Sequence, residues 1–333
     1  MEYQDVQAPF NLLSPDLVAE CVEEAYEIKL QALVFPYPSY VNRVYGLRDQ
    51  DGIDYVVKFY RPSRWEAGAI NEEHRFLFQL AEAECPVVLP LRDREGSTLQ
   101  TLELEISDGG ELLFPFALFP KRGGRIFDAE RDEDWLRLGA LAGRVHSVGR
   151  RESSSNRWTL KPGLLGTYAG ELRSQGLVHP ECAEDFLTVC SAAAEVLDNL
   201  LGTCRSLRIH GDFHRGNILD RGEEGLLLID FDDMCQGPAV QDLWLLLPGH
   251  ARESQRELNL VIEGYEEFAE FDRRELRLIE ALRFFRMVHF LRWQALQRRD
   301  EAFQKTFPNW GSRTFWIKEV EDLRDQLDEI AFP

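Results

Sequence analysis

The sequence lacks long hydrophobic runs and any excess of basic residues. Its longest apolar stretches, such as "LWLLL" at 243–247, are far shorter than the roughly 20 residues that a membrane-spanning helix needs. Lysine and arginine total 38 against 58 aspartates and glutamates, which gives a formal net charge of −20. Nucleic-acid-binding proteins neutralise phosphates with a basic surface. We therefore expect neither a membrane nor a nucleic-acid partner, and we interpret the arginine-rich stretch 283–299 as a solvated helix face.

Cysteine motifs and a targeting segment are also absent. The six cysteines are scattered without a C-x-x-C pair, which is typical of free thiols in a reducing compartment rather than of a disulfide framework or a zinc site. The first ten residues, "MEYQDVQAPF", contain neither the basic region nor the apolar region of a secretory signal. These features predict a soluble cytoplasmic protein, and we expect a monomer.

The first 120 residues predict a small lobe that contains both helices and strands. Ser14 and Pro15 form a helix-start signal before an apolar pattern of helical period. The stretch 40–62 predicts a β-hairpin with a turn at "RDQDG", 65–83 predicts a helix, and extended pieces separated by turns at "DREGS" and "SDGGE" follow Pro86. We therefore assign 1–120 to an N-lobe.

The rest of the chain predicts a larger, mainly helical lobe, 121–333. The segment "KRGGR" at 121–125 has the composition of a hinge, and a clear amphipathic helix follows it. Further helices are predicted near 181–201, 240–247, 252–270, 272–299 and 314–329. A β-like island at 206–233 interrupts them, with its polar residues on a loop between apolar strands. Such a loop on a rigid support is where functional residues concentrate.

The loop "HGDFHRGNIL" permits two kinds of chemistry. His210, Asp212 and His214 could bind the metal ion of a hydrolase, in which the metal activates water. Alternatively, Asp212 and Asn217 have the D-x-x-x-x-N spacing of a phosphoryl-transfer loop, in which the aspartate accepts the proton of the attacking hydroxyl and the asparagine binds Mg²⁺. Asp230, at the end of the apolar strand "LLLID", is then placed to hold Mg²⁺ against the phosphates.

Lys58 and Glu73 extend the second interpretation into the N-lobe. Lys58 lies in the apolar strand "DYVVKFY", and Glu73 follows in a helix, although the adjacent Glu72 could take its place. A strand lysine paired with a helix glutamate is how protein kinases hold the ATP phosphates. The phosphoryl-transfer interpretation thus explains more of the chain than the hydrolase interpretation. A non-catalytic nucleotide-binding module is a remote alternative, because no catalytic group is missing.

These motifs resemble the aminoglycoside phosphotransferase and choline kinase superfamily, with "HGDFHRGNIL", "LLIDFDD" and "GPAVQDLWLLL" carrying the likeness. Within it, "PSYVNRVYGL", "VVKFYRP" and "EEHRFLFQL" resemble the bacterial stress-response serine/threonine protein kinases. The resemblance implies an α+β, two-lobed protein-kinase-like fold with a small sheet-containing N-lobe and a larger mainly helical C-lobe. It also implies ATP as co-substrate and Mg²⁺ as cofactor.

The same resemblance implies roles for individual residues. Asp212 and Asp230 are the catalytic residues, Asn217 and Asp230 the metal ligands, and Lys58, Glu73 and Ser39 the nucleotide-binding residues. Asp242 is expected to brace the catalytic loop. The implied reaction transfers the ATP γ-phosphoryl group to serine or threonine of a protein, with autophosphorylation, in a stress response. A small-molecule hydroxyl kinase of aminoglycoside, choline or homoserine type remains the alternative.

Overall fold

The computed structural model describes residues 10–39, 41–105 and 110–331. Within these ranges the chain divides into two compact units. The first unit contains the described residues up to Ile126 together with Ile218–Asp232, and the second contains Phe127–Asn217 together with the residues from Asp233 onward. The first nine residues of the "MEYQDVQAPF" segment and most of the expected turn at 107–111 lie outside the described residues.

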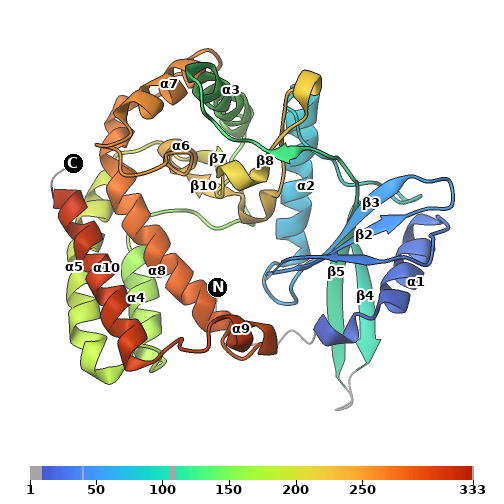
Figure 1. Ribbon diagram of the computed structural model, residues 1–333, viewed down its shortest axis with the longest axis horizontal. Helices are drawn as coiled ribbons and strands as arrows, with labels where there is room; N and C mark the ends of the chain where they lie inside the picture. Colours follow the sequence, from blue (N-terminus) through green and yellow to red (C-terminus); the bar gives the residue numbers. More distant parts are fainter. Residues whose placement is uncertain (1–9, 40, 106–109, 332–333) are drawn as a thin grey trace. The chain divides into compact units, whose positions relative to one another are not determined.

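A five-stranded antiparallel sheet forms the centre of the first unit (Figure 1). Its strand order is β1-β2-β3-β5-β4. The strands are β1 (Phe35–Tyr37), β2 (Arg43–Arg48), β3 (Asp54–Phe59), β4 (Gln100–Glu105) and β5 (Glu111–Pro120). The expected hairpin is confirmed as β2 and β3, whose register pairs Val44 with Lys58.

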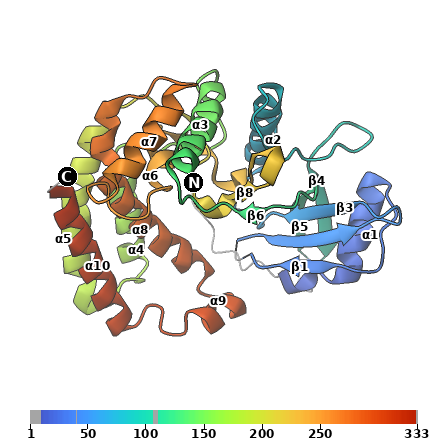
Figure 2. The same ribbon diagram turned by 45° about the horizontal axis from the view of Figure 1, so that its top comes forward.

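Helix α1 (Pro15–Tyr26) covers one face of this sheet. The Ser14 Oγ accepts a hydrogen bond from the Leu17 N–H at 3.2 Å, which confirms the predicted helix start. Val18 and Val22 of α1 are fully buried in the apolar cluster that the strands complete. Figure 2 shows α1 alongside the strands.

The alternation of β3 separates the two faces of the sheet. Val57 and Phe59 point into the cluster with α1, whereas Val56 and Lys58 line a pocket on the other face. Because successive side chains of a strand point to opposite faces, the helix α2 (Ala67–Glu82), which lines the same pocket, covers the face opposite α1.

A small three-stranded sheet completes the first unit. It consists of β6 (Arg125–Ile126), β8 (Ile218–Asp220) and β9 (Leu226–Leu228), in the order β6-β8-β9. Val87 forms an isolated bridge with Leu228, so this sheet joins the segment that follows α2. The stretch 218–232 therefore carries Asp230 into the unit that contains Lys58.

The second unit is mainly helical. Its helices are α3 (Asp132–Gly149), α4 (Leu164–Ser174), α5 (Ala183–Leu201), α6 (Val240–Trp244), α7 (Gln255–Glu266), α8 (Ile279–Gln297), α9 (Glu301–Thr306) and α10 (Arg313–Ala331). The predicted helices of this region are confirmed, but α4 and α9 were not predicted from the sequence. Helix α4 lies in "KPGLLGTYAGEL", where glycines weaken the helical pattern.

Within this unit, α4, α5, α8 and α10 pack side by side (Figure 1; Figure 2). A two-stranded antiparallel ribbon of β7 (Leu207–Ile209) and β10 (Cys235–Gly237) lies among the helices. This ribbon holds the two ends of the segment 210–234, which contains the predicted catalytic loop.

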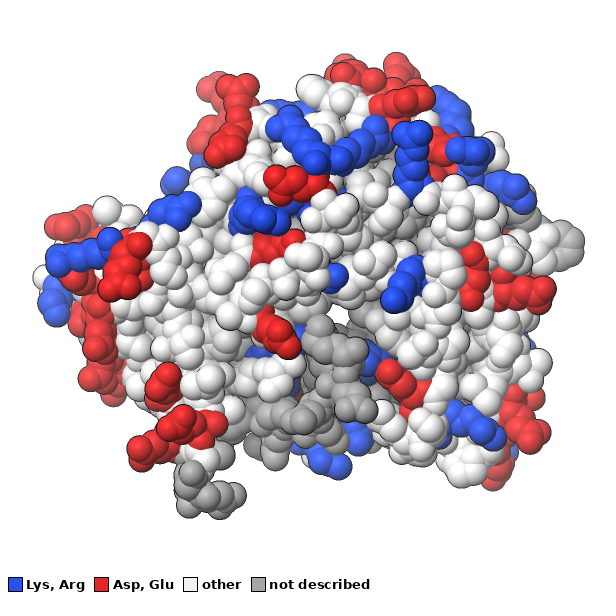
Figure 3. All heavy atoms as spheres, turned by 180° about the vertical axis from the view of Figure 1, so that it is seen from behind, with Lys and Arg blue, Asp and Glu red and all other residues white. Residues whose placement is uncertain are grey.

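The surface carries charges of both signs. Figure 3 shows acidic and basic side chains interspersed over the face that it draws. Among the described residues, no helix is both long and apolar enough to cross a lipid bilayer.

Helices α3 and α7 pack through glycine. A Cβ atom at Gly139 would lie 1.9 Å from the Val261 carbonyl oxygen, so the backbones touch there. We expect Gly139→Ala to force the helices apart and to lower the free energy of unfolding by about 2 kcal/mol or more, measured by urea denaturation.

The matched control is Gly170→Ala in α4, where an added Cβ meets nothing within 4 Å. Alanine in an exposed helix is favoured over glycine by about 0.5–1 kcal/mol, so this variant should be slightly stabilised. Equal effects of the two substitutions would contradict the close packing of α3 against α7.

Candidate active site

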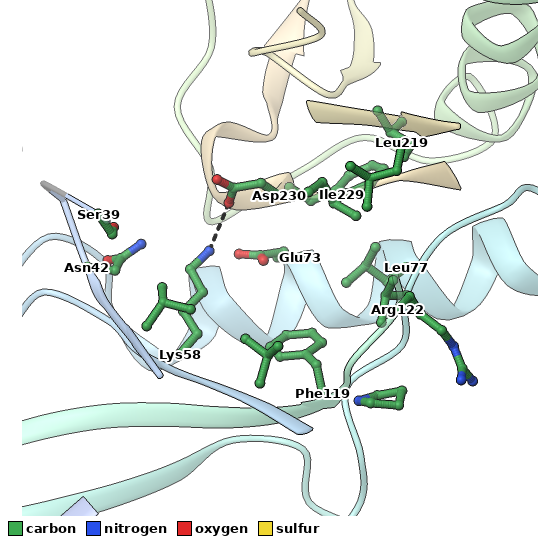
Figure 4. Close-up of a pocket in the computed structure, with 16 residues that line it drawn as sticks. Ser39, Asn42, Lys58, Glu73, Leu77, Phe119, Arg122, Leu219, Ile229 and Asp230 are labelled. Carbon is green, nitrogen blue, oxygen red and sulfur yellow. Dashed lines mark hydrogen bonds and ion pairs between the residues drawn. The ribbon is translucent and has the colours of Figure 1, made fainter. Parts of the chain in front are cut away.

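The first unit contains a pocket on the sheet face that α2 covers (Figure 4). Its walls are mainly apolar, with Val44 and Val56 from the strands and Leu77 from α2. Further apolar side chains complete them: Val88, Phe119, Pro120, Leu219, Leu228, Ile229 and Phe231. Polar groups gather at one end, where Lys58 and Asp230 meet. An apolar slot with a charged end suits a flat ring that carries a charged tail.

Lys58 is buried in this pocket and is held by carboxylates. Its Nζ lies 3.1 Å from Asp230 Oδ1 and 3.2 Å from Asp232 Oδ1. Burial would lower the pKa of Lys58, but the charges of Asp230, Asp232 and Glu73 raise it well above its usual value. Lys58 is therefore a fixed cation rather than a lysine on the solvent face of its strand.

Of the two candidate glutamates, Glu73 lines the pocket. It is 2% exposed, and its charge acts on Lys58. Glu72 contacts Arg75 at 3.4 Å. The arrangement favours Glu73 as the helix partner of Lys58.

Asp230 has a backbone conformation that is rare for an aspartate. Its φ is 63°, in the left-handed region. Non-glycine residues in this region are strained, and such strain persists where the surroundings hold it. The side chain is 55% exposed, so its carboxylate contacts Lys58 and still reaches into the pocket (Figure 4).

Asp232 is the buried counterpart of Asp230. It is 4% exposed and contacts Lys58, the Arg64 guanidinium and the Asn42 Nδ2, the last at 3.2 Å. Two cations therefore neutralise this carboxylate. Its contacts favour a role in anchoring Lys58.

The segment before β2 borders the pocket through Ser39 and Asn42. The Ser39 carbonyl accepts a hydrogen bond from Arg43 at 3.0 Å. The Asn42 Oδ1 accepts one from the Arg61 N–H at 3.1 Å, while its Nδ2 donates to Asp232. Side chains rather than glycines thus fix this segment, which has Gly46 as its nearest glycine.

In the second unit, the predicted catalytic loop follows β7 and requires Gly211. This residue has a φ of +84°, and a Cβ atom there would lie 2.2 Å from the Asp233 carbonyl oxygen. Neither the conformation nor the space admits a larger residue. The glycine of "HGD" therefore lets the loop turn tightly beside the end of β10.

Asp242 braces this loop, as expected from the sequence. Its Oδ2 accepts from the His210 N–H at 2.8 Å and its Oδ1 from the Gly211 N–H at 2.9 Å. His146 Nε2 lies 2.9 Å from Oδ2, and its Nδ1 lies 3.2 Å from the Tyr265 hydroxyl. Asp242 is fully buried, so these bonds fix the loop backbone without competition from water.

Asp212 is held ionised by two side chains. Arg286 Nη2 donates to its Oδ1 at 2.7 Å, and His214 Nε2 lies 3.3 Å from its Oδ2. Burial would raise the pKa of Asp212, but the hydrogen bond from His214 and the charge of Arg286 hold it well below its usual value. The contacts of Oδ2 are long, 3.3 Å to His214 and 3.4 Å to Asn217, so this oxygen is the one able to accept a further hydrogen bond.

Asn217 is oriented as a metal ligand would be. Its Nδ2 donates to the Asp212 carbonyl at 2.9 Å. Among the described residues, no donor reaches its Oδ1. Mg²⁺ binds through one or two such oxygen donors, with water and phosphate filling its other positions. The Asn217 amide oxygen and the Asp230 carboxylate are each oxygen donors of the kind that this ion binds.

The hydrolase interpretation fits the loop poorly. The His210 ring is fully buried, and its Nδ1 accepts from the Asp212 N–H at 3.2 Å. Within the described ranges, no three His, Cys, Asp or Glu side chains gather in a way that could hold a metal ion. His210 is thus a structural part of the loop.

The expectation that arginines 283–299 form a solvated helix face was wrong for Arg283 and Arg292, whose side chains are 22% and 12% exposed. Arg286 contacts Asp212. Arg283 donates to the Gly249 carbonyl at 2.8 Å, and Arg292 donates to Glu171 at 2.6 Å. Arg286 stays partly exposed, whereas acceptors within their unit hold Arg283 and Arg292. Arg286 therefore lies at the candidate site, where no sequence pattern had placed it.

Comparison with known proteins identifies the chain. Residues 36–279 match the model of the phosphotransferase enzyme family. The chain belongs to this family. Stress response kinase A of Escherichia coli (strain K12) is 37% identical over 97% of this chain and 95% of its own length. Serine/threonine protein kinase RdoA of Salmonella typhimurium is 37% identical over the same shares of the two chains.

Solved structures show the fold. Amicoumacin kinase hAmiN, in complex with AMP-PNP, Ca²⁺ and Ami, superposes with a TM-score of 0.71 at 19% identity, over 95% of this chain and 92% of that one. Spectinomycin phosphotransferase APH(9)-Ia superposes with a TM-score of 0.64 at 17% identity, over 98% of both chains. These structures confirm the α+β, protein-kinase-like fold class. The family match and the kinase relatives confirm the expectation of an ATP-dependent phosphotransferase.

Removal of the Asp242 carboxylate should disorder the loop that it braces. In Asp242→Ala, the N–H groups of His210 and Gly211 lose their acceptor, which costs about 1–3 kcal/mol for each buried group. We expect a loss of about 3 kcal/mol in the free energy of unfolding, measured by urea denaturation.

Asp198→Ala is the control, because Asp198 accepts an exposed bond from the Gly163 N–H at 2.9 Å. It should cost less than about 1 kcal/mol, since water replaces the lost acceptor. An Asp242→Ala variant no less stable than this control would contradict the brace.

Glu275, of the short 3-10 helix Arg273–Leu278, should make stability depend on pH. It accepts from the Val240 N–H at 3.0 Å, at the start of α6, and burial raises its pKa from 4.5 to about 7. Its folded pKa lies above its unfolded pKa, so its contribution is full below about pH 4.5 and is lost as the pH rises through about 7. Glu275→Gln should remove this decline, measured as denaturation midpoints across that range. Parallel midpoint curves for the two proteins would refute the assignment.

Proposed function

We propose that this protein is an ATP- and Mg²⁺-dependent kinase that phosphorylates serine or threonine residues of proteins, itself included, as a cytoplasmic monomer in a bacterial stress response. The likeness to a protein named serine/threonine protein kinase RdoA, at 37% identity over 97% of the chain, supports the protein acceptor. The likeness to proteins named stress response kinase A supports the physiological setting.

The observation that carries the proposal is the state of Asp212. It lies in a D-x-x-x-x-N loop with its backbone braced by Asp242, its Oδ1 bound to Arg286 and its Oδ2 in long contacts only. A carboxylate that is ionised, oriented and still able to accept a hydrogen bond is what a phosphoryl-transfer enzyme needs beside the attacking hydroxyl.

In this proposal the pocket of the first unit binds the nucleotide. The adenine ring lies between its apolar walls, and Lys58 contacts the α- and β-phosphates while Glu73 holds the lysine. Ser39, at the edge of the pocket, lies in the segment that covers the phosphates. The division into a nucleotide-binding lobe and a catalytic lobe near residue 120 stays a prediction. The segment 218–232 belongs to the first unit and contributes Asp230 to it.

Asn217 and Asp230 would each supply an oxygen ligand to the metal ion. When bound, Mg²⁺ neutralises charge on the phosphate oxygens. Asp230 meets the need for a ligand close to Lys58, since it contacts that lysine at 3.1 Å. Asn217 meets the need for a ligand close to the catalytic aspartate, since its amide already bonds to the Asp212 carbonyl.

The reaction follows from these placements. The acceptor hydroxyl donates a hydrogen bond to Asp212 Oδ2, and its oxygen forms a bond to the γ-phosphorus. The bond between that phosphorus and the β–γ bridging oxygen breaks, and ADP leaves with the electron pair. The hydroxyl proton passes to Asp212 and then to water. The lowered pKa of Asp212 makes it a weak base, so its main contribution is the orientation of the hydroxyl.

A small-molecule acceptor is the second candidate. It is favoured by the fold shared with a kinase of amicoumacin and a phosphotransferase of spectinomycin, at 19% and 17% identity. The two candidates differ in the acceptor and share the same catalytic residues.

An acceptor panel distinguishes them. The purified protein is incubated with γ-labelled ATP and Mg²⁺, with serine and threonine peptides in one series and with small alcohols in another. We expect label on peptide hydroxyls and on the protein itself, with phosphoserine or phosphothreonine identified by mass spectrometry. Transfer to small alcohols alone would replace the proposed function with the second candidate.

Asp230→Asn should separate metal binding from folding. Asparagine tolerates the left-handed conformation of residue 230, so the fold should persist. The loss of the carboxylate charge should weaken Mg²⁺·ATP binding by about tenfold or more and lower the rate, measured by calorimetry and by initial rates. Unchanged binding of Mg²⁺·ATP would remove Asp230 from the metal site.

A further inference from the structure

Arg286 gives the catalytic loop a cationic neighbour that the proposed reaction does not require. It lies in α8, 74 residues from Asp212 in sequence, and its Nη2 donates to Asp212 Oδ1 at 2.7 Å. An aspartate that only had to bind a hydroxyl would be served by backbone donors. The ion pair between Arg286 and Asp212 is therefore expected to have a further function.

Most of the guanidinium remains available. An arginine has five N–H donors, and among the described residues the Asp212 carboxylate is the only hydrogen-bond partner of Arg286. Its side chain is 41% exposed, whereas that of Asp212 is 22% exposed. An approaching molecule therefore meets the arginine more than the aspartate.

A second partly exposed, nitrogen-bearing side chain lies beside the other oxygen of Asp212. His214 lies 3.3 Å from Oδ2, and its side chain is 40% exposed. The negative charge of Asp212 is thus compensated by Arg286 and bordered by an imidazole that is positive when protonated. Such a surrounding offers no attraction to a cation and offers donors to an anion.

The neighbouring arginines of α8 are engaged elsewhere. Arg283 bonds to Glu280 at 3.1 Å and to the Gly249 carbonyl at 2.8 Å. Arg292 is 12% exposed and bonds to Glu171. Arg286 therefore differs from both in pairing with the candidate catalytic aspartate while leaving donors exposed.

We propose that Arg286 determines acceptor specificity: it selects acceptors whose hydroxyl is flanked by an anionic group and rejects acceptors whose hydroxyl is flanked by cations. The inference rests on the proposed role of Asp212 as the residue that binds the acceptor hydroxyl. The acceptor class that follows is a serine or threonine with acidic neighbours rather than a polyamine-like or basic molecule.

The selectivity would arise from the position of the Arg286 charge relative to the bound hydroxyl. A hydroxyl bound to Asp212 Oδ2 places the groups next to it within reach of the exposed guanidinium. A carboxylate there gains a charge-assisted hydrogen bond from an Arg286 N–H that bonds to none of the described residues. An ammonium there meets a like charge, and such repulsion is an effective means of discrimination.

The test compares matched acceptors. Peptides identical except for aspartate, alanine or lysine beside one serine are assayed for kcat/KM with wild type, Arg286→Ala and Arg286→Glu. We expect wild type to prefer the aspartate peptide over the lysine peptide by about tenfold. Arg286→Ala should reduce the ratio to near one, and Arg286→Glu should invert it.

Two further variants control for structure. Arg286→Lys keeps the charge and should keep most of the preference. Arg256→Ala removes an exposed arginine whose Nη2 lies 2.7 Å from Asp132 Oδ1, the same geometry away from the loop, and should leave the ratio unchanged. Thermal unfolding checks that every variant folds.

A second panel keeps the inference separate from the protein-kinase proposal. It pairs a hydroxy acid with an amino alcohol of similar size. If wild type phosphorylates only small alcohols, the protein acceptor is wrong, and the inference on Arg286 is then judged by the hydroxy acid to amino alcohol ratio. Any of three results would overturn the inference on Arg286: a wild-type preference for cationic acceptors, a ratio unchanged in Arg286→Glu, or no transfer to any acceptor.

Discussion

The candidate site depends on keeping the carboxylate of Asp212 ionised and aimed although it is mostly buried. Burial alone would favour its neutral form. The hydrogen bond from His214 counters this effect. Asp242 fixes the loop backbone by accepting the N–H groups of both His210 and Gly211. Arg286 then supplies the compensating charge. The ribbon of β7 and β10, the helix α6 and the helix α8 all contribute to one carboxylate.

In the pocket of the first unit the signs of the charges are reversed. There the buried group is the cation of Lys58, and the charges of Asp230, Asp232 and Glu73 keep it protonated. Asp232 is itself shared with Arg64 and Asn42. Each unit therefore contains a largely buried charge with opposite charges beside it. This pre-organisation suits phosphoryl transfer, where positioning and electrostatic stabilisation provide most of the catalysis.

The sequence predicted the parts of this arrangement that depend on local pattern. The hairpin around Lys58, the helix that starts at Ser14 and the D-x-x-x-x-N loop have signals within a few residues, and the structure contains all three elements. It did not predict Arg286 beside Asp212, or Asn42 and Arg64 beside Asp232, which lie 74, 190 and 168 residues apart in the chain. Contacts between residues far apart in the chain produce no local pattern in the sequence from which they could be predicted. The charge of the arginine run predicted a solvated helix face, whereas Asp212, the Gly249 carbonyl and Glu171 bind three of its side chains.

The central claim is that Asp212 acts on the chemical step and not on nucleotide binding. The direct measurement is single-turnover transfer by wild type and Asp212→Asn, with Mg²⁺·ATP binding followed by calorimetry on the same samples. Because this substitution is nearly isosteric, we predict unchanged Mg²⁺·ATP affinity and a transfer rate lowered by about 100-fold or more. A transfer rate close to that of wild type, with the fold intact, would contradict the account.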